Sequence, residues 1–206
     1  MKAICVYCSS SDAVAPAYFD AAQALGAEIA ARGCTLVYGG ANLGLMGTVA
    51  RAVHRGGGRV VGVIPQALQG KGLTYEEADD LVVTRDMRER KAEMETRADA
   101  FVALPGGFGT LEELLEVLTL RQLRLHTKPI VLLNTRGFYA PLVALFEHFY
   151  GERFAKPLRE FYHVAPDVAG AFTYLDDYRP FVAQDKWFKP GESEGDANSA
   201  EGSSMD

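Results

Sequence analysis

The stretch AFVALPGGFGTLEELLEVLTL, residues 100–120, decides the fold of this chain. It opens with a short apolar run from Ala100 to Leu104, passes through a glycine-rich turn and continues with apolar residues at mixed three- and four-residue spacing. The first pattern is typical of a buried strand and the last of an amphipathic helix. A strand that leads directly into a helix is the repeating unit of a parallel sheet.

The same alternation extends on both sides of this unit. Short apolar and β-branched runs predict strands over Ile4–Tyr7, Thr35–Tyr38, Val60–Ile64, Leu81–Thr84, Ala100–Leu104 and Ile130–Leu133. Longer periodic patterns predict helices over Tyr18–Arg32, Met46–Arg55, Met87–Arg97, Leu111–Leu123 and Tyr139–Phe149. Because strands such as Ile130–Leu133 are apolar throughout, helices should bury both of their faces. The sequence therefore predicts an α/β fold, a single doubly wound parallel sheet of Rossmann-like type with helices on both faces.

Length and composition indicate one globular domain. The chain has 206 residues, of which 48% are hydrophobic and 23% charged, as in ordinary globular proteins. From Lys189 onward it is rich in Gly, Ser, Glu and Asp and has almost no apolar residues to bury. We expect a domain over residues 1–188 and a disordered acidic tail over residues 189–206.

Charge and cysteine usage narrow the class of partner. The net charge of −6 argues against nucleic acid and anionic membranes, because both attract a basic surface. No apolar run approaches the ~18 residues of a membrane-spanning helix. The three cysteines, Cys5, Cys8 and Cys34, show no metal-ligand spacing and follow no secretory segment. A cytoplasmic protein that binds a small molecule is expected.

Two glycine-rich turns follow predicted strands, where α/β sheets bind their ligands. They are YGGANLGLMG at residues 38–47 and LPGGFGT at residues 104–110. The glycines of the first turn would let backbone amides approach a ligand closely, and at the second turn bare amides at the start of a helix favour an anion such as phosphate. Neither G-x-G-x-x-G nor G-x-x-x-x-G-K-[ST] occurs in the chain, which disfavours ordinary NAD and ATP enzymes. One Gly-Gly pair alone more often makes only a tight turn, but two such turns favour a ligand site.

Charged residues beside these turns allow two interpretations each. Thr110 and Glu113 have the spacing of a capping box, with Thr110 as the N-cap, which would also leave the Glu113 carboxylate beside the anion site. Residues 86–94, DMRERKAEM, place three cations near the start of a helix, against its macrodipole. Either a bound phosphate compensates these cations, or they form a solvated face with the neighbouring glutamates.

The two motifs together resemble a known family. PGGFGTLEE at residues 105–113, with MRERK at residues 87–91, is similar to the Lonely Guy phosphoribohydrolases, and the glycine turn at residues 39–47 matches theirs. The resemblance implies a nucleotide-binding hydrolase domain that cleaves cytokinin riboside 5′-monophosphates to free base and ribose 5-phosphate, without a cofactor and often as a dimer. Some relatives were labelled lysine decarboxylases, but the chain has no pyridoxal-phosphate signature.

The resemblance also assigns roles to residues. Arg90 and Glu113 would be catalytic: Arg90 would hold the departing base or a nearby oxygen, and Glu113 would stabilise an oxocarbenium-like transition state or activate water. The backbone amides of residues 107–110 and Lys91 would hold the 5′-phosphate. The expected substrate-binding residues are Lys91, Gly106, Gly107, Phe108, Gly109, Thr110, Leu111, Glu112, Thr119, Gly39, Gly40, Gly44 and Met87. No metal is expected, since the four histidines match no ligand spacing. Two positions depart from the family pattern: Arg88 is often His, and Ser9 is often Gly.

Two other functions fit the same residues. A general purine nucleoside 5′-monophosphate nucleosidase acting on AMP would use the same turns and the same Arg–Glu pair. A non-catalytic nucleotide-binding or cofactor-carrier module would use the amides but would not need Glu113. The apolar stretch Phe138–Tyr150 allows two interpretations: it belongs to the core, or it exceeds what one small sheet can cover and is buried in a homodimer, which we expect.

Overall fold

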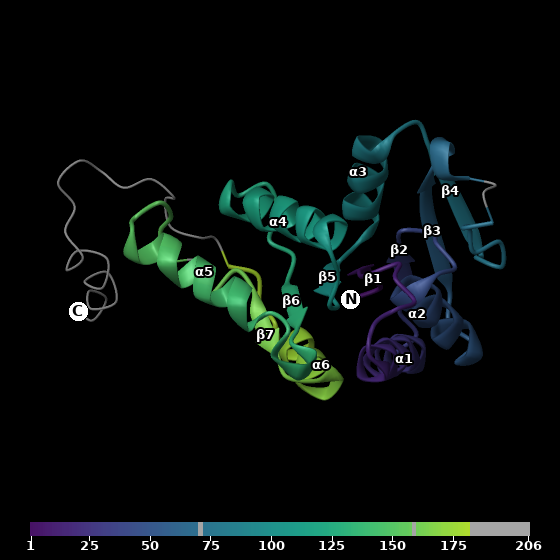
Figure 1. Cartoon of the computed structure of the whole chain (residues 1–206), viewed down its shortest axis with the longest axis horizontal. Helices are drawn as coiled ribbons and strands as arrows, with labels where there is room; N and C mark the ends of the chain where they lie inside the picture. The colour runs from purple at the N-terminus through teal and green to yellow at the C-terminus, as the bar shows by residue number, and fades with distance from the viewer. Residues whose placement is uncertain (70–71, 158–159, 182–206) are drawn as a thin grey trace, which may run out of the picture.

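The computed structural model describes residues 1–69, 72–157 and 160–181, which form one sheet covered by helices (Figure 1). The sheet has seven strands, all parallel, in the order β4-β3-β2-β1-β5-β6-β7. The strands are β1 (Ala3–Tyr7), β2 (Thr35–Tyr38), β3 (Val60–Pro65), β4 (Asp80–Thr84), β5 (Ala100–Ala103), β6 (Ile130–Leu133) and β7 (His163–Ala165). The predicted fold class is confirmed. The tail predicted at residues 189–206 lies outside the described residues.

Helices cover both faces of this sheet. One face carries α1 (Pro16–Ala31), α2 (Gly44–Arg55) and α6 (Val168–Asp177), and the other carries α3 (Met87–Arg97), α4 (Phe108–Gln122) and α5 (Ala140–Gly151) (Figure 1). Two short 3₁₀ turns, η1 (Gln66–Leu68) and η2 (Thr135–Gly137), complete the described elements. Along β1, Ile4 and Val6 enter one core while Cys5 and Tyr7 enter the other. Because both faces are buried, the strand is apolar at every position.

The strand order places a crevice beside β1. The chain builds outward from β1 through β2, β3 and β4, and then returns to pair β5 with the other edge of β1. Where the strand order reverses in this way, the connections that follow neighbouring strands cross to opposite faces of the sheet. A space therefore opens beyond the carboxyl ends of these strands. Both glycine-rich turns begin at these carboxyl ends, one after β2 and one after β5.

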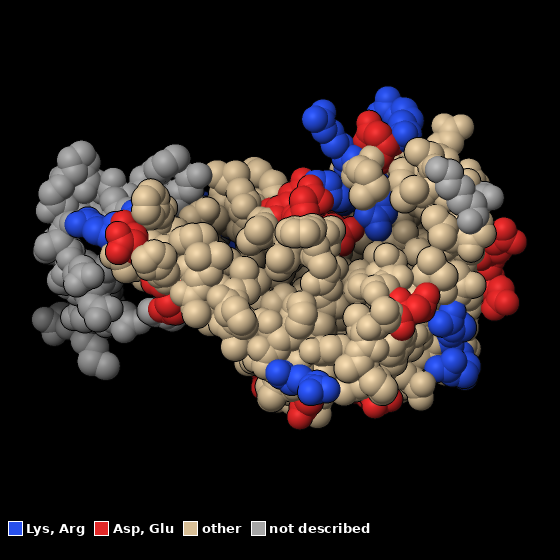
Figure 2. Space-filling view, in the orientation of Figure 1, with Lys and Arg blue, Asp and Glu red and all other residues tan. Residues whose placement is uncertain are grey.

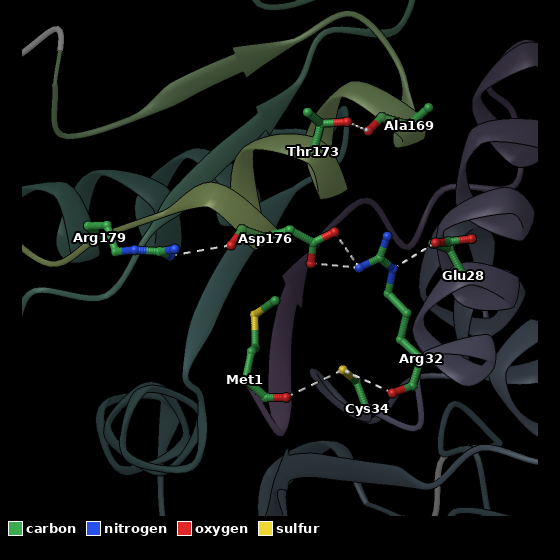
Figure 3. A network of polar contacts seen from close by, with 8 residues as sticks. All are labelled: Met1, Glu28, Arg32, Cys34, Ala169, Thr173, Asp176 and Arg179. Atoms are coloured by element: carbon green, nitrogen blue, oxygen red, sulfur yellow. Dashed lines mark hydrogen bonds and ion pairs between the residues drawn. The ribbon is translucent and has the colours of Figure 1, made fainter.

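The last strand and helix were not predicted from the sequence. β7 has only three residues, two of them only partly buried, so it lacks the apolar run that marks the other strands. α6 is held against α1 partly by charge: the Arg32 guanidinium, which also pairs with Glu28 of α1, binds the Asp176 carboxylate of α6 at 2.6 Å (Figure 3). The same guanidinium lies 4.4 Å from the Phe172 ring of α6. These contacts join residues far apart in the chain, which no local pattern reveals.

The predicted capping box at Thr110 is wrong. α4 begins at Phe108 with Gly107 as its N-cap, and the Leu111 amide donates to the Gly107 carbonyl at 3.0 Å. Thr110 therefore lies inside the first turn, and Glu113 does not reach back to cap it. The helix starts earlier than predicted and includes Gly109, although glycine is a poor helix former. Glu113 is consequently free to pair with another helix.

Candidate functional site

A cleft of about 400 Å³ opens at the carboxyl ends of the central strands. Its walls come from the turns after β1 and β2, the end of β3, the segment before β4, and the first turns of α3 and α4. The lining residues are Cys8, Ser9, Ser10, Gly39, Ala41, Leu43, Met46, Ile64, Leu68, Leu73, Met87, Arg90, Gly107, Gly109, Thr110, Glu112 and Glu113. The cleft lies at the position where doubly wound sheets bind ligands.

A buried ion pair lies in this cleft. Arg90 on α3 and Glu113 on α4 are 5% and 4% exposed, and Arg90 Nη1 lies 2.7 Å from Glu113 Oε1. Arg90 Nε also donates to the Val63 carbonyl of β3 at 3.0 Å. Burial raises the pKa of the Glu113 carboxyl, and the neighbouring Arg90 charge opposes this rise. A carboxylate with a raised pKa in a cleft is suited to proton transfer.

The start of α3 and its cation Lys91 are compensated by the protein itself. Asp86 caps the helix by accepting from the Arg88 and Glu89 amides, each at 2.9 Å. Lys91 pairs with Glu112 and, at 2.8 Å, with Glu116, and Figure 2 shows acidic and basic side chains gathered where α3 and α4 meet. Burial acts to lower the pKa of Lys91, but the two carboxylates outweigh it and raise the pKa. A bound phosphate is therefore not needed to explain this run of cations.

The start of α4 presents open donors to the cleft. The amides of Phe108, Gly109 and Thr110 occupy the first helical positions, which have no intrahelical acceptor, and they make no hydrogen bond within residues 1–69, 72–157 and 160–181. At Gly107 and Gly109 the space around a hypothetical Cβ is empty to 4 Å, so an anion can approach the backbone. Gly106 serves packing instead, because a Cβ there would lie 2.0 Å from Thr110 Oγ1.

The first glycine turn differs, because other residues of the protein already accept hydrogen bonds from the amides at the start of α2. The Gly44 amide donates to Asp12 Oδ1 at 2.9 Å, and the Leu45 and Met46 amides donate to the Ser9 carbonyl at 3.0 and 3.3 Å. Gly44 has a φ of +55°, and a Cβ there would lie 2.5 Å from the Ser10 backbone. This turn therefore joins two loops of the protein, and α4 remains the helix with open amides.

The segment between β3 and β4 forms an apolar wall of the cleft. It contributes Leu68 and Leu73, and the Leu73 carbonyl accepts from the Asn42 amide at 2.7 Å. The next anchor is the buried Tyr75, whose amide donates to Gly40 O at 2.9 Å and whose hydroxyl lies 2.7 Å from His54 Nδ1. These contacts hold the wall in place.

The structure brings together part of the site predicted from the sequence. The predicted residues that line the cleft are Arg90, Glu113, Gly39, Met87, Gly107, Gly109, Thr110 and Glu112. Those that do not line it are Lys91, Gly40, Gly44, Gly106, Phe108, Leu111 and Thr119. Thr119 instead lines an apolar recess between α4 and α5, where its hydroxyl donates to the Leu115 carbonyl at 2.7 Å.

The other lining residues were not among the predicted site residues, although Ala41, Leu43 and Met46 belong to the first glycine turn and Ser9 was singled out as a departure from the family pattern. Ser9 and Ser10 could have been found, because they follow the first strand directly, at the same edge as the glycine turns. The apolar residues, such as Ile64 and Leu73, have no signal that separates them from core residues.

The described part of the chain holds neither a metal-ligand cluster nor a membrane-spanning helix. Within the described ranges, no three His, Cys, Asp or Glu side chains are grouped to hold a metal ion. In the same ranges, no helix has both the length and the apolar character to cross a membrane. Cys5, Cys8 and Cys34 are buried and free.

The fold and cleft define the class of Rossmann-like α/β proteins that bind a small ligand at the switch point of the sheet. Within that class, the family model described as "Possible lysine decarboxylase" matches residues 46–175. The cytokinin riboside 5′-monophosphate phosphoribohydrolase LOG7 of Arabidopsis thaliana is 47% identical over 180 residues, spanning 87% of this chain and 83% of that protein. The enzyme LOG of Oryza sativa subsp. japonica is also 47% identical, over 87% of this chain and 74% of its own. The chain belongs to the Lonely Guy (LOG) family.

A solved structure of a different protein shares the fold. The Moco carrier protein from Chlamydomonas reinhardtii superimposes with a TM-score of 0.65 at 27% sequence identity, covering 85% of this chain and 95% of that one. The same architecture therefore occurs in a protein named as a carrier.

Proposed function

We propose that this chain hydrolyses the N-glycosidic bond of cytokinin riboside 5′-monophosphates, releasing the free base and ribose 5-phosphate. The relatives at 47% identity are named for this activity. The observation that carries the proposal in this chain is the buried Arg90–Glu113 pair in a cleft that also presents the open amides of α4. A carrier needs the amides but has no use for a carboxylate with a raised pKa.

The pair can divide the chemistry between its two members. Ionised Glu113 stabilises the positive charge that develops at the anomeric carbon and takes a proton from the attacking water. The bond from that carbon to the base breaks, its electron pair stays on the base, and the water oxygen forms the new bond. The proton that Glu113 has taken then passes to the base, which leaves as the neutral product, and Glu113 is ionised again. Arg90 holds Glu113 through Nη1, and its remaining donors steady the departing base.

The 5′-phosphate is assigned to the amides of Phe108, Gly109 and Thr110. Lys91 lies outside the cleft lining and contributes by holding Glu112, which lines it. Hydrogen bonds to a charged group contribute about 1.5–3 kcal/mol each. Loss of two of them should lower kcat/KM for an unphosphorylated nucleoside at least about a hundredfold.

Base release measured on matched nucleosides and 5′-monophosphates tests this assignment. We expect the monophosphates to be strongly preferred whatever the base. Equal kcat/KM values for the two forms would rule out the phosphate site at α4.

The apolar wall supports a prenylated base over plain adenine. Leu68, Leu73 and Met87 line the cleft, and Leu68 and Met87 are 41% and 46% exposed in the structure. A prenyl group on the base would cover this surface, and each Å² of apolar surface buried would stabilise the complex by roughly 25 cal/mol. AMP has no group that can do so.

The pH dependence of the reaction should report Glu113. This residue acts when ionised, and burial raises its pKa more than Arg90 lowers it. As the pH falls through that raised pKa, kcat/KM should therefore decline, at a pH above the range usual for a glutamate. A pH profile of kcat/KM on the monophosphate measures the midpoint. A rate that stays constant down to the ordinary glutamate range would contradict this role.

A homodimer through the face formed by α4 and α5 is part of the proposal. α5 has Phe146 as its single fully buried residue, whereas Leu115, Leu145 and Phe149 are 42%, 45% and 37% exposed. Leu115 and Phe149 line the apolar recess between α4 and α5, which has a volume of about 160 Å³, and the surface over the middle of α5 is largely uncharged (Figure 2). Exposed apolar patches of this kind typically bind another protein.

Light scattering on the wild type and on the Leu115→Glu variant tests this assembly. We expect the mass of a dimer for the wild type and that of a monomer for the variant, since the new charge would be buried at the interface. A monomeric wild type would reject the proposal.

We also propose that the protein is located in the cytoplasm, because its described cysteines are free and buried. For the globular domain we propose the boundaries 1–188.

A further inference from the structure

Gly39 ends β2 at the cleft, and its backbone does not require glycine. Its neighbour Gly40 has a φ of +76°, in the left-handed region that disfavours side chains. Gly39 is not among the described glycines with positive φ, so an alanine could adopt the same conformation. The reason for glycine at this position must be the space around it.

That space is filled by Arg90. A Cβ on Gly39 would lie 2.0 Å from Arg90 Nη2 and 3.2 Å from Arg90 Cζ. The next atom, Met46 Cε, is 3.3 Å away. The guanidinium therefore occupies the volume that any side chain at Gly39 would take.

The three nitrogens of the guanidinium then have three different surroundings. Nε donates to the Val63 carbonyl, and Nη1 binds Glu113. Nη2 rests against Gly39, a lining residue of the cleft, and makes no hydrogen bond to any described residue. Nη2 is thus the donor that remains for a bound substrate.

We propose that Gly39 is a positioning residue for Arg90: the missing side chain lets the guanidinium reach Val63 and Glu113 together while its third nitrogen stays at the cleft. This rests on the proposed function. Gly39 acts through space, in contrast to Gly40 and Gly44, whose positive φ values serve the turn. Its role also differs from that of Gly107, whose surroundings are open.

The Gly39→Ala variant tests the proposal. It should fold, because the atom in its way is the end of a flexible side chain and the backbone is unstrained, so Tm should change by no more than about 2–4 °C. Displacing Arg90 by about 1 Å should lower kcat on the order of a hundredfold. The acid limb of the pH profile should move to higher pH, since Arg90 no longer opposes the raised pKa of Glu113. Gly151→Ala, at an open position at the end of α5, is the matched control and should behave as wild type.

Combining the substitution with Arg90→Met separates a positioning role from direct contact. If Gly39 acts through Arg90, Gly39→Ala should cause no further loss of the residual rate in the Arg90→Met background. The same factor of loss in both backgrounds, or a wild-type kcat for Gly39→Ala, would overturn the proposal. Titration of Glu113 by carbon-13 NMR gives a readout without turnover. A raised Glu113 pKa in Gly39→Ala supports the positioning role even if no base is released, and an unchanged pKa contradicts it.

Discussion

Replacing Glu113 with glutamine should lower kcat by about 10²–10⁴-fold while the enzyme still binds a nucleoside 5′-monophosphate. Glutamine keeps the size of the side chain and can still accept from Arg90 Nη1, so the cleft keeps its shape. It carries no negative charge to stabilise the anomeric carbon and cannot take the proton from water. Chromatography of released base measures kcat, and calorimetric titration measures binding of the monophosphate.

A matched control lies on the same helix. Glu116 pairs with Lys91 at 2.8 Å and does not line the cleft, so Glu116→Gln should retain normal turnover. If Glu113→Gln turned over as fast as this control, Glu113 would not be the catalytic carboxylate.

Replacing Arg90 with methionine should destabilise the protein by about 3–5 kcal/mol near neutral pH. The change leaves the Glu113 carboxylate 4% exposed and without its cation, which raises its pKa further. When the pKa of Glu113 is higher in the folded than in the unfolded protein, protonation of this residue stabilises the folded protein. This stabilisation is complete below the ordinary pKa of glutamate and is lost as the pH rises through the raised pKa. The deficit relative to wild type should therefore be small at low pH and full above the raised pKa.

Urea unfolding at about pH 5 and about pH 8 measures this difference. The double variant Arg90→Met, Glu113→Leu carries neither charge and should recover much of the stability lost at the higher pH. An equal deficit at both pH values would show that the loss comes from packing and not from the unpaired carboxylate.

The fold could be predicted because its signals are local. Each central strand is a short apolar run, and the turn at residues 104–110 marks where a strand passes into a helix. β7 escaped prediction because its three residues, two of them only partly buried, form no such run. The start of α4 was predicted too late, at Leu111, because the low helix propensity of Gly109 argues against a helix there. The tertiary structure at the cleft overrides this propensity, and Gly109 is helical.

The site was predictable in its residue types but not in its contacts. The motifs identify Arg90 and Glu113, yet the ion pair joins residues 23 positions apart, and its third partner is the Val63 carbonyl on another strand. Similarly, the bond from the Gly44 amide to Asp12 spans 32 positions and occupies the first amide of α2 with an acceptor from the protein itself. From the sequence, amides of both turns were expected to approach a ligand, because the acceptors that bind the amides at the start of α2 are visible only in three dimensions.

The central claim is tested most directly by incubating the purified protein with isopentenyladenosine 5′-monophosphate and with AMP, and quantifying free base and ribose 5-phosphate by chromatography. We expect equimolar release of isopentenyladenine and ribose 5-phosphate, with a higher kcat/KM for the prenylated substrate than for AMP. Binding of both monophosphates without release of either base would contradict the account and identify the protein as a binding module.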